Sequence, residues 1–275
     1  MIWRTLLLTT ATLALSAPAF AEAPGDAVPG HPGVTYAMLL KQIAPDLTKD
    51  ENNVWTLSGM KAFRNIGAPK EAFAEAISFG SLTVVHMRED GHKRILLFSG
   101  DYGGGDGFDA LLAAFDDEAK TPKLLDYMNV GGDRFNDLRE VKPIAAATDM
   151  FVVTSSHSNS NQSYELDTPM FLRGGKLQSI TTLFVFGNSF CRYSEGQSAS
   201  YAASPQPKLP YYTLKISVSV DIVLSGETEC GDAMKPPKGR SRVVSDIYRW
   251  NGKTFAPTIK AVEALSAANW KANNE

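Results

Sequence analysis

Residues 168–186, with the sequence TPMFLRGGKLQSITTLFVF, decide the fold class of this chain. Two apolar runs rich in β-branched and aromatic residues flank the pair Gly174 and Gly175. Such a pair is typical of a tight β-hairpin, because both central residues of a type I′ turn need a positive φ, which glycine adopts freely. The stretch therefore predicts two antiparallel strands joined by a short turn.

The same pattern occurs twice more in the chain. An Asp-Gly pair at 90–91 interrupts the apolar residues 84–98, and an Asn-Gly pair at 251–252 interrupts residues 243–255. Asn and Asp accept positive φ at low cost, so both pairs also favour type I′ turns. Further strands are expected at residues 110–115, 123–130, 149–155 and 211–224, although Ala and Leu leave a helical alternative open for the first two. The sequence therefore predicts a mainly β fold of antiparallel hairpins, either propeller-like or sandwich-like.

Short helices are expected at both ends of the β-rich part. Apolar residues follow the helical i, i+3, i+4 spacing in residues 36–43, and Pro45 ends this helix. A second helical piece is expected at residues 69–77, with proline in its first turn. Residues 258–271 are expected to close the chain as a helix. Its inward-facing residues are predicted to be Ile259, Val262 and Leu265.

The first 21 residues have the layout of a secretory signal peptide. Arg4 precedes an apolar core at residues 6–15, and the small residues that follow predict cleavage after Ala21. This core is shorter than the roughly 18 residues of a membrane span. An N-terminal helix kept as an anchor is the alternative. We therefore expect a periplasmic or extracellular protein with no transmembrane segment after signal removal.

The predicted mature chain begins with a tether. Residues 22–33 are rich in Pro and Gly, so His31 is expected to be solvated there. One β-rich domain follows at residues 34–275, and its first part, residues 34–78, is expected to be helical. The whole chain has 27 Lys and Arg against 30 Asp and Glu. A mildly acidic protein has no basic surface for nucleic acid or anionic lipid, so neither is an expected partner.

The two cysteines are expected to form a disulfide. Cys191 lies in residues 188–210, which are rich in Ser, Tyr, Gln and Pro and predicted to be a long loop, and Cys230 lies in a second predicted loop. An even cysteine count in an exported chain is typical of a disulfide, because the compartment is oxidising. Two buried free thiols are the alternative.

Residues 100–109 form a loop that could hold a cation. Asp101, Asp106 and Asp109 stand among glycines, and carboxylates with inward-turned carbonyl groups are the ligands that calcium prefers. The spacing does not match an EF-hand, because Leu112 stands where the last ligand would be. A calcium site and a solvated connecting loop both remain open.

Residues 155–164 are a polar run that could bind a ligand. Hydroxyl, amide, imidazole and aromatic groups commonly furnish binding surfaces for small molecules and glycans. The candidate ligand-binding residues are His157, Asn159, Asn161, Gln162 and Tyr164. The alternative is a plain turn between two strands, which is also rich in Ser and Asn.

Catalytic motifs are incomplete in this sequence. The Gly252-Lys253-Thr254 string resembles the end of a phosphate loop but lies in a predicted hairpin. His86, His92 and His157 could share a metal only if the fold joined them. We therefore expect an exported, non-catalytic protein that binds a small molecule, a glycan or an envelope protein. The alternative is a cell-envelope hydrolase with a site near His157 and the carboxylates of residues 101–109.

Overall fold

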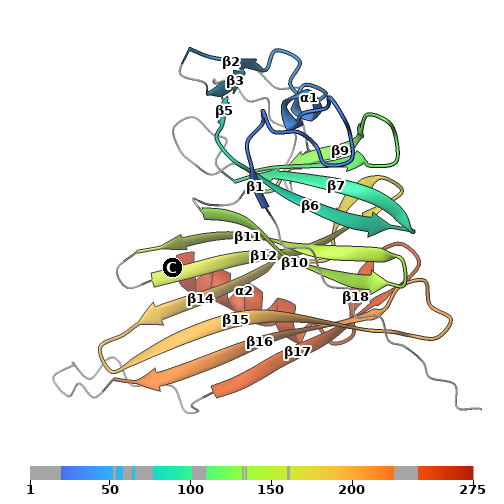
Figure 1. Cartoon of the computed structure of the whole chain (residues 1–275). Helices are drawn as coiled ribbons and strands as arrows, with labels where there is room; N and C mark the ends of the chain where they lie inside the picture. The colour runs from blue at the N-terminus through green and yellow to red at the C-terminus, as the bar shows by residue number, and fades with distance from the viewer. Residues whose placement is uncertain are drawn as a thin grey trace, which may run out of the picture.

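The computed structural model describes residues 20–51, 54–57, 64–65, 77–100, 110–131, 133, 135–159, 162–225 and 241–274. Within these residues the protein is mainly β, with antiparallel sheets and a short C-terminal helix (Figure 1). The fold class predicted from the hairpin signals is therefore confirmed. None of the described helices is long and apolar enough to cross a membrane.

Six described strands form the first sheet, called the short sheet. In spatial order they are β1 (Phe20–Glu22), β6 (Leu82–Glu89), β7 (His92–Ser99), β8 (Leu111–Asp116), β9 (Lys123–Asn129) and β4 (Arg64–Asn65). Neighbouring strands are antiparallel except β4 and β9. Asp90 and Gly91 join β6 to β7 with φ angles of 49° and 85°, as the Asp-Gly signal predicts.

Nine described strands form the second, long sheet. In spatial order they are β10 (Phe135–Ala145), β11 (Thr148–Ser158), β12 (Gln162–Arg173), β14 (Leu183–Ser189), β15 (Tyr193–Ser204), β16 (Thr213–Leu224), β17 (Ser241–Trp250) and β18 (Phe255–Pro257), with β13 (Lys176–Ser179) paired to β12. Gly174 and Gly175 join β12 to β13 with φ angles of 57° and 68°, which confirms the hairpin predicted at residues 168–186.

The third predicted turn has a different geometry. Residues 251–254 join β17 to β18. The Asn251 Oδ1 atom accepts hydrogen bonds from the backbone N–H groups of Lys253 and Thr254. The asparagine side chain therefore closes a longer loop, and the expected two-residue turn is wrong here.

The remaining described elements lie near the two ends of the chain. They are α1 (Tyr36–Leu40), a three-stranded sheet of β2 (Thr48–Lys49), β3 (Trp55–Leu57) and β5 (Ile77–Phe79), and the C-terminal helix α2 (Ala261–Asn274). The prediction that residues 34–78 are helical holds only for α1. Most of the helix predicted at residues 69–77 lies outside the described residues, and its last residue begins β5.

The short sheet packs face to face against the β10–β13 end of the long sheet (Figure 1). Leu96 and Phe98 of β7 pack in one core with Phe151 of β11 and Met170 of β12. These side chains are at most 2% exposed. A core enclosed between two sheets is the arrangement of a β-sandwich. Of the two predicted alternatives, propeller-like and sandwich-like, the fold is therefore the second.

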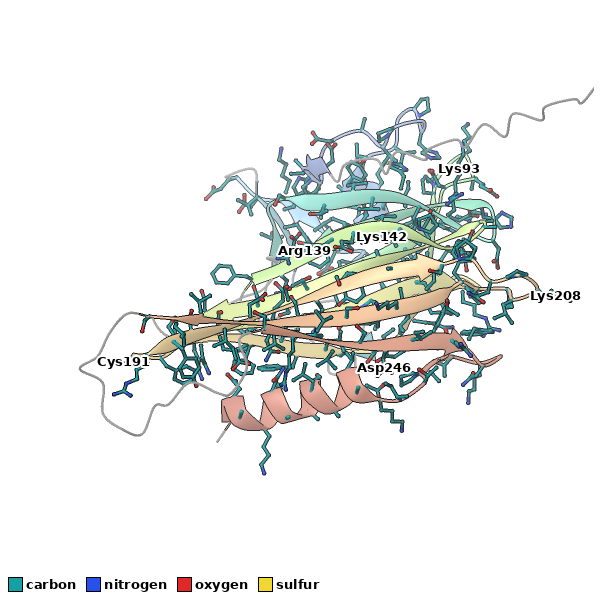
Figure 2. All side chains as sticks on the ribbon, turned by 90° about the horizontal axis from the view of Figure 1, so that it is seen from below. Lys93, Arg139, Lys142, Cys191, Lys208 and Asp246 are labelled. Atoms are coloured by element: carbon teal, nitrogen blue, oxygen red, sulfur yellow. The ribbon has the colours of Figure 1, made fainter. Side chains whose placement is uncertain are left out.

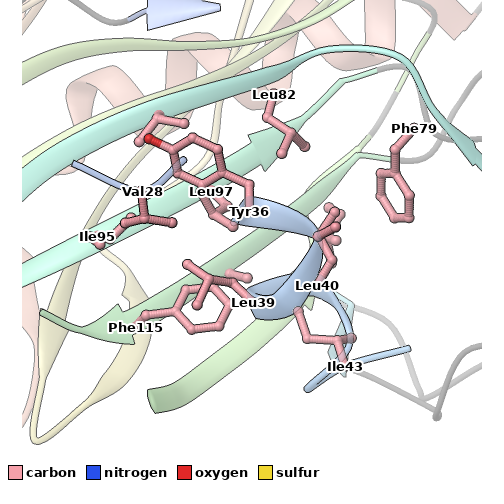
Figure 3. Packing of buried hydrophobic residues seen from close by; sticks show 14 of the residues in the cluster. Val28, Tyr36, Leu39, Leu40, Ile43, Phe79, Leu82, Ile95, Leu97 and Phe115 are labelled. Atoms are coloured by element: carbon pink, nitrogen blue, oxygen red, sulfur yellow. The ribbon is translucent and has the colours of Figure 1, made fainter. Parts of the chain in front are cut away.

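The other face of the short sheet is covered by the N-terminal segment. Figure 3 shows Tyr36 and Leu39 of α1 facing Ile95 and Phe115, in a core that also includes Val28. Residues 22–33 therefore do not behave as a free tether, since Val28 is 2% exposed. His31 is also buried, so the prediction of a solvated linker histidine is wrong.

The C-terminal helix lies along the long sheet, as Figure 2 shows, with Asp246 of β17 near its start. The Asp246 carboxylate accepts hydrogen bonds from the backbone N–H groups of Ile259 and Val262. This carboxylate satisfies the free N–H donor of Val262 in the first turn of the helix and complements the helix dipole. Val262 is fully buried and Leu265 packs beside it, as predicted, whereas Ile259 is 70% exposed and its inward prediction is wrong.

Strand β15 replaces much of the loop predicted at residues 188–210. It pairs with β16 along its whole length, from Tyr193 opposite Leu224 to Ser204 opposite Thr213. The alternation was hidden because the residues packed on the core include small ones such as Ala199 and Ala203. On β16, by contrast, the expected apolar face is confirmed. Its buried residues are Leu214, Ile216, Val218 and Val220.

Candidate ligand-binding groove

A groove opens where β14 and β15 separate. It has a volume of about 530 Å³ and is lined by residues of β10, β11, β12, β14 and β15. We call it the main groove. Its polar lining includes Arg139, Ser156, Ser158, Ser163, Glu165 and Ser198. Hydroxyl and charged groups thus predominate in the lining.

The groove exists because β14 and β15 pair only through Gly187–Ser189 and Ser194–Gly196. Gly187 and Gly196 lie opposite each other at this junction. A Cβ atom at Gly187 would lie 2.9 Å from Ser163 Oγ, whereas a Cβ atom at Gly196 would have no neighbour within 4 Å. Gly187 therefore leaves room for the Ser163 side chain of β12, and Gly196 leaves space open in the groove.

Beyond the junction, α2 takes the place of a strand partner for β14. The Phe184 N–H donates to Ser266 Oγ at 2.8 Å, and Asn269 Nδ2 donates to the Phe184 carbonyl oxygen at 2.9 Å. Asn269 Nδ2 also donates to Gln197 Oε1 of β15 at 2.6 Å. The buried Asn269 amide therefore links the two separated strands. It fixes the width of the gap between β14 and β15, which we call the fork.

The main groove carries a charged pair. Arg139 Nη1 lies 3.0 Å from Glu165 Oε2, and Arg139 Nε lies 3.2 Å from Asp137 Oδ2. The Arg139 and Glu165 side chains are 47% and 29% exposed. Exposed pairs of this kind add little to stability, so these groups remain available to a ligand.

A second, smaller groove of about 290 Å³ continues the first. It shares Ser163, Gly187 and Gly196 with the main groove. Its other polar residues include Asn159, Gln162, Asn188 and Glu195. We call it the side groove. Together the two grooves offer a continuous polar path across the end of the long sheet.

A hydrogen-bonded network lies beside the main groove. His157 Nδ1 lies 3.2 Å from Asp133 Oδ1, and the Tyr164 hydroxyl donates to Asp133 Oδ2. The His157 and Tyr164 rings stack with their centroids 5.6 Å apart, and Tyr164 also stacks on Phe184 at 5.0 Å. The Asp133 side chain is 7% exposed and that of His157 is 29% exposed. The network therefore fastens the segment around Asp133 to β11 and β12.

The structure brings together four of the five predicted ligand-binding residues. His157 and Tyr164 line the main groove, and Asn159 and Gln162 line the side groove. Asn161 lies outside the described residues. The polar run is not a free loop, because residues 155–158 belong to β11 and residues 162–164 to β12.

The other predicted sites lie partly or wholly outside the described residues. This holds for Asp101, Asp106 and Asp109, so the calcium site stays a prediction. It also holds for Cys230, and the disulfide with Cys191 likewise stays a prediction.

The histidines do not meet at one site. His86 and His92 of the short sheet lie near Asp117 and Glu118, whereas His157 contacts Asp133. Across the residues that the structure describes, no group of three or more His, Cys, Asp or Glu side chains could hold a metal ion.

Sequence reasoning missed Arg139, Glu165 and the glycines of the junction. Glu165 lies in β12 two residues from Asp167, so both side chains point to the same side of the strand. This alternation was readable in the sequence. The contribution of Gly196 was not, because the strand that carries it was predicted to be a loop.

Comparison with known proteins provides no relative from which a role could be inferred. The chain matches no family model, no curated protein and no solved structure.

Proposed function

We propose that this chain is an exported binding protein whose main and side grooves hold a polar, hydroxyl-rich ligand such as a segment of a glycan. The observation that carries the proposal is the continuous polar lining of the two grooves. Sugar hydroxyls both donate and accept hydrogen bonds, and the lining offers Ser hydroxyls, Asn and Gln amides and the Arg139–Glu165 pair.

Tyr164 and His157 stiffen the wall of the main groove. They lie opposite each other in the β11–β12 pairing, next to the Ser156–Glu165 pair, so their rings point to the other face of the sheet from those two polar side chains. Asp133 holds both rings in place. The strands that carry the polar side chains are therefore ordered before a ligand arrives, which lowers the conformational cost of binding.

The experiment is a binding screen of the mature protein against a panel of bacterial and plant oligosaccharides. Gly196→Arg should fill both grooves without backbone strain, since a side chain at this position meets no neighbour at its Cβ atom. We expect at least a tenfold loss of affinity for any oligosaccharide that the wild type binds. Gly80→Arg is the matched control, because Gly80 is exposed and equally open.

The result that contradicts the proposal is equal affinity in the Gly196→Arg and Gly80→Arg variants. If neither the wild type nor the variants bind any oligosaccharide in the panel, that result also counts against a glycan ligand.

One observation favours the hydrolase alternative. The pairing of His157 with the buried Asp133 is the arrangement that orients a histidine as a general base. Among the described residues the acidic partner is then Asp133, while residues 101–109 lie outside them. Hydrolysis of chromogenic glycoside and ester substrates should fall at least a hundredfold in His157→Gln if this alternative holds. Equal background rates in wild type and variant would exclude it for those substrates.

A further inference from the structure

Asp167 continues the row of β12 side chains that begins in the main groove with Ser163 and Glu165. It is 5% exposed. Thr154 Oγ1 donates to Asp167 Oδ1 at 3.0 Å, and the Tyr201 hydroxyl donates to Asp167 Oδ2 at 2.9 Å. Thr154 belongs to β11 and Tyr201 to β15. The carboxyl group is thus held by donors from both sides of the fork.

Charged groups surround this carboxyl from the adjoining strands. Glu165 lies two residues before Asp167 on the same side of β12, and its negative charge acts on Asp167. Glu165 in turn faces Arg139 in the groove. The remaining charged and titratable groups are Tyr201 of β15, Glu140 of β10, whose charge acts on Tyr201, and Lys142, which pairs with Glu140 at 2.5 Å.

The surroundings favour the protonated form of the Asp167 carboxyl. Burial first, and then the charge of Glu165, raise the pKa of Asp167 to about 7. The hydrogen bonds from Tyr201 and Thr154 act in the opposite direction. A carboxyl group beside a second, negative carboxylate resists losing its proton, because both groups would then be negative. Small changes in nearby charge therefore change how often Asp167 is protonated.

We propose that the main groove is proton-linked, so that any charged group entering it beside Glu165 changes the protonation of Asp167. A cationic group favours the ionised carboxyl and expels the proton, whereas an anionic group draws a proton in. By reciprocity, affinity for an amine-bearing ligand rises with pH through the neutral range, and affinity for an acidic ligand falls. This inference rests on the proposed function in that it describes the same groove.

The test introduces charge without needing a ligand. Ser156 lines the main groove and lies directly opposite Glu165 in the β11–β12 pairing. Opposed residues of this kind have Cβ atoms roughly 5 Å apart, so a charge placed there acts on the carboxyl pair. Carbon-13 NMR of aspartate carboxyl groups follows the titration, and Asp167→Asn identifies the resonance.

Ser156→Lys should lower the titration midpoint of Asp167, and Ser156→Glu should raise it, each on the order of one pH unit. Ser81→Lys and Ser81→Glu are the controls, since Ser81 is exposed and precedes β6 of the short sheet. Both controls should leave the midpoint unchanged.

Arg139→Gln provides an independent variant if the Ser156 variants do not fold. Removing the guanidinium that faces Glu165 should raise the midpoint of Asp167. The proposal is overturned if the wild-type midpoint lies in the ordinary carboxyl range. It is also overturned if neither Ser156 variant shifts the midpoint or if Arg139→Gln leaves it in place.

The outcome is separate from that of the glycan screen. A groove that binds no oligosaccharide can still show the Ser156-dependent titration, which would leave the proton linkage standing and remove only the glycan. An unshifted Asp167 in a protein that binds oligosaccharides would remove only the linkage.

Discussion

His31 Nε2 lies 2.6 Å from Asp117 Oδ1, and this contact joins the N-terminal segment to the connection between β8 and β9. The His31 and Asp117 side chains are 9% and 12% exposed. The hydrogen bond to Asp117 is the main cause that raises the pKa of His31, although burial opposes it. Because the folded pKa lies above the unfolded value, the contact stabilises the protein fully below about pH 6.5. Its contribution is lost as pH rises through the folded pKa.

We therefore expect His31→Gln to reduce the free energy of unfolding by about 2 kcal/mol at pH 6 and by less at pH 9. Urea unfolding at the two pH values measures the difference. His92→Gln is the control, because the His92–Glu118 pair is exposed and should contribute little at either pH. A loss that grows from pH 6 to pH 9 would contradict the assigned direction.

Gly175→Val should destabilise the β12–β13 turn. The φ angle of Gly175 is 68°, and its added Cβ atom would lie 3.4 Å from Leu125 Cδ2. A β-branched residue at positive φ costs roughly 1–3 kcal/mol, and the crowding adds to it. Urea unfolding should show this loss, while Gly80→Val, with space and no positive φ, should show much less. Equal stability of the two variants would mean that the turn tolerates a side chain.

Tyr164→Phe should cost about 1–2 kcal/mol, because it removes the hydroxyl that donates to buried Asp133. Tyr164→Ala should cost more, since it also removes the stacking on Phe184. Thermal unfolding of both variants measures the two losses of stability and shows which is larger. Phe135→Ala is the control, because Phe135 is 63% exposed and begins the strand after Asp133. Wild-type stability in Tyr164→Ala would show that the network is not formed in solution.

The predicted disulfide between Cys191 and Cys230 closes a loop of about 40 residues, for which chain entropy gives roughly 4 kcal/mol. Reductant should therefore lower the melting temperature of the exported protein. The same reductant should not affect a variant that carries both Cys191→Ser and Cys230→Ser. Two free thiols titrated in the native exported protein would contradict the bridge.

The exported protein should begin at Glu22, because the residues around Ala21 fit a signal-peptidase site. Cleavage there would remove Phe20 and Ala21 from β1 and leave only Glu22 of that strand. N-terminal sequencing of material from the periplasm or culture medium gives the answer directly. Recovery of a chain that still begins at Met1 would refute both the cleavage and the predicted localisation.

The hairpins were predictable because their signals are local. Gly174, Gly175 and Gly91 require only a turn between apolar runs, and positive φ at these positions follows from the residue type. The burial of His31 was not predictable in this way. Its partner Asp117 is 86 residues away in the chain, and no short-range pattern indicates that the two meet.

The candidate site likewise combines residues that local sequence patterns predict with residues that only the fold brings together. The polar run of β11 and β12 stands out in the sequence, and His157 and Tyr164 do line the main groove. Asp133 and Arg139 join them only because the strands pair in one register. Gly196 was not predictable, because β15 places small residues on the core. Small residues conceal the alternation of buried and exposed side chains along this strand.

The fork between β14 and β15 makes one backbone amide a reporter for the whole C-terminal helix. The Phe184 N–H is hydrogen-bonded to Ser266 of α2 and not to a neighbouring strand. Its exchange with deuterium should therefore follow the detachment of α2, whereas amides of β15 and β16, paired along their full length, should exchange only when that part of the sheet opens. Two amide protons close to the groove would then report on different opening events, and the groove would widen whenever the helix leaves.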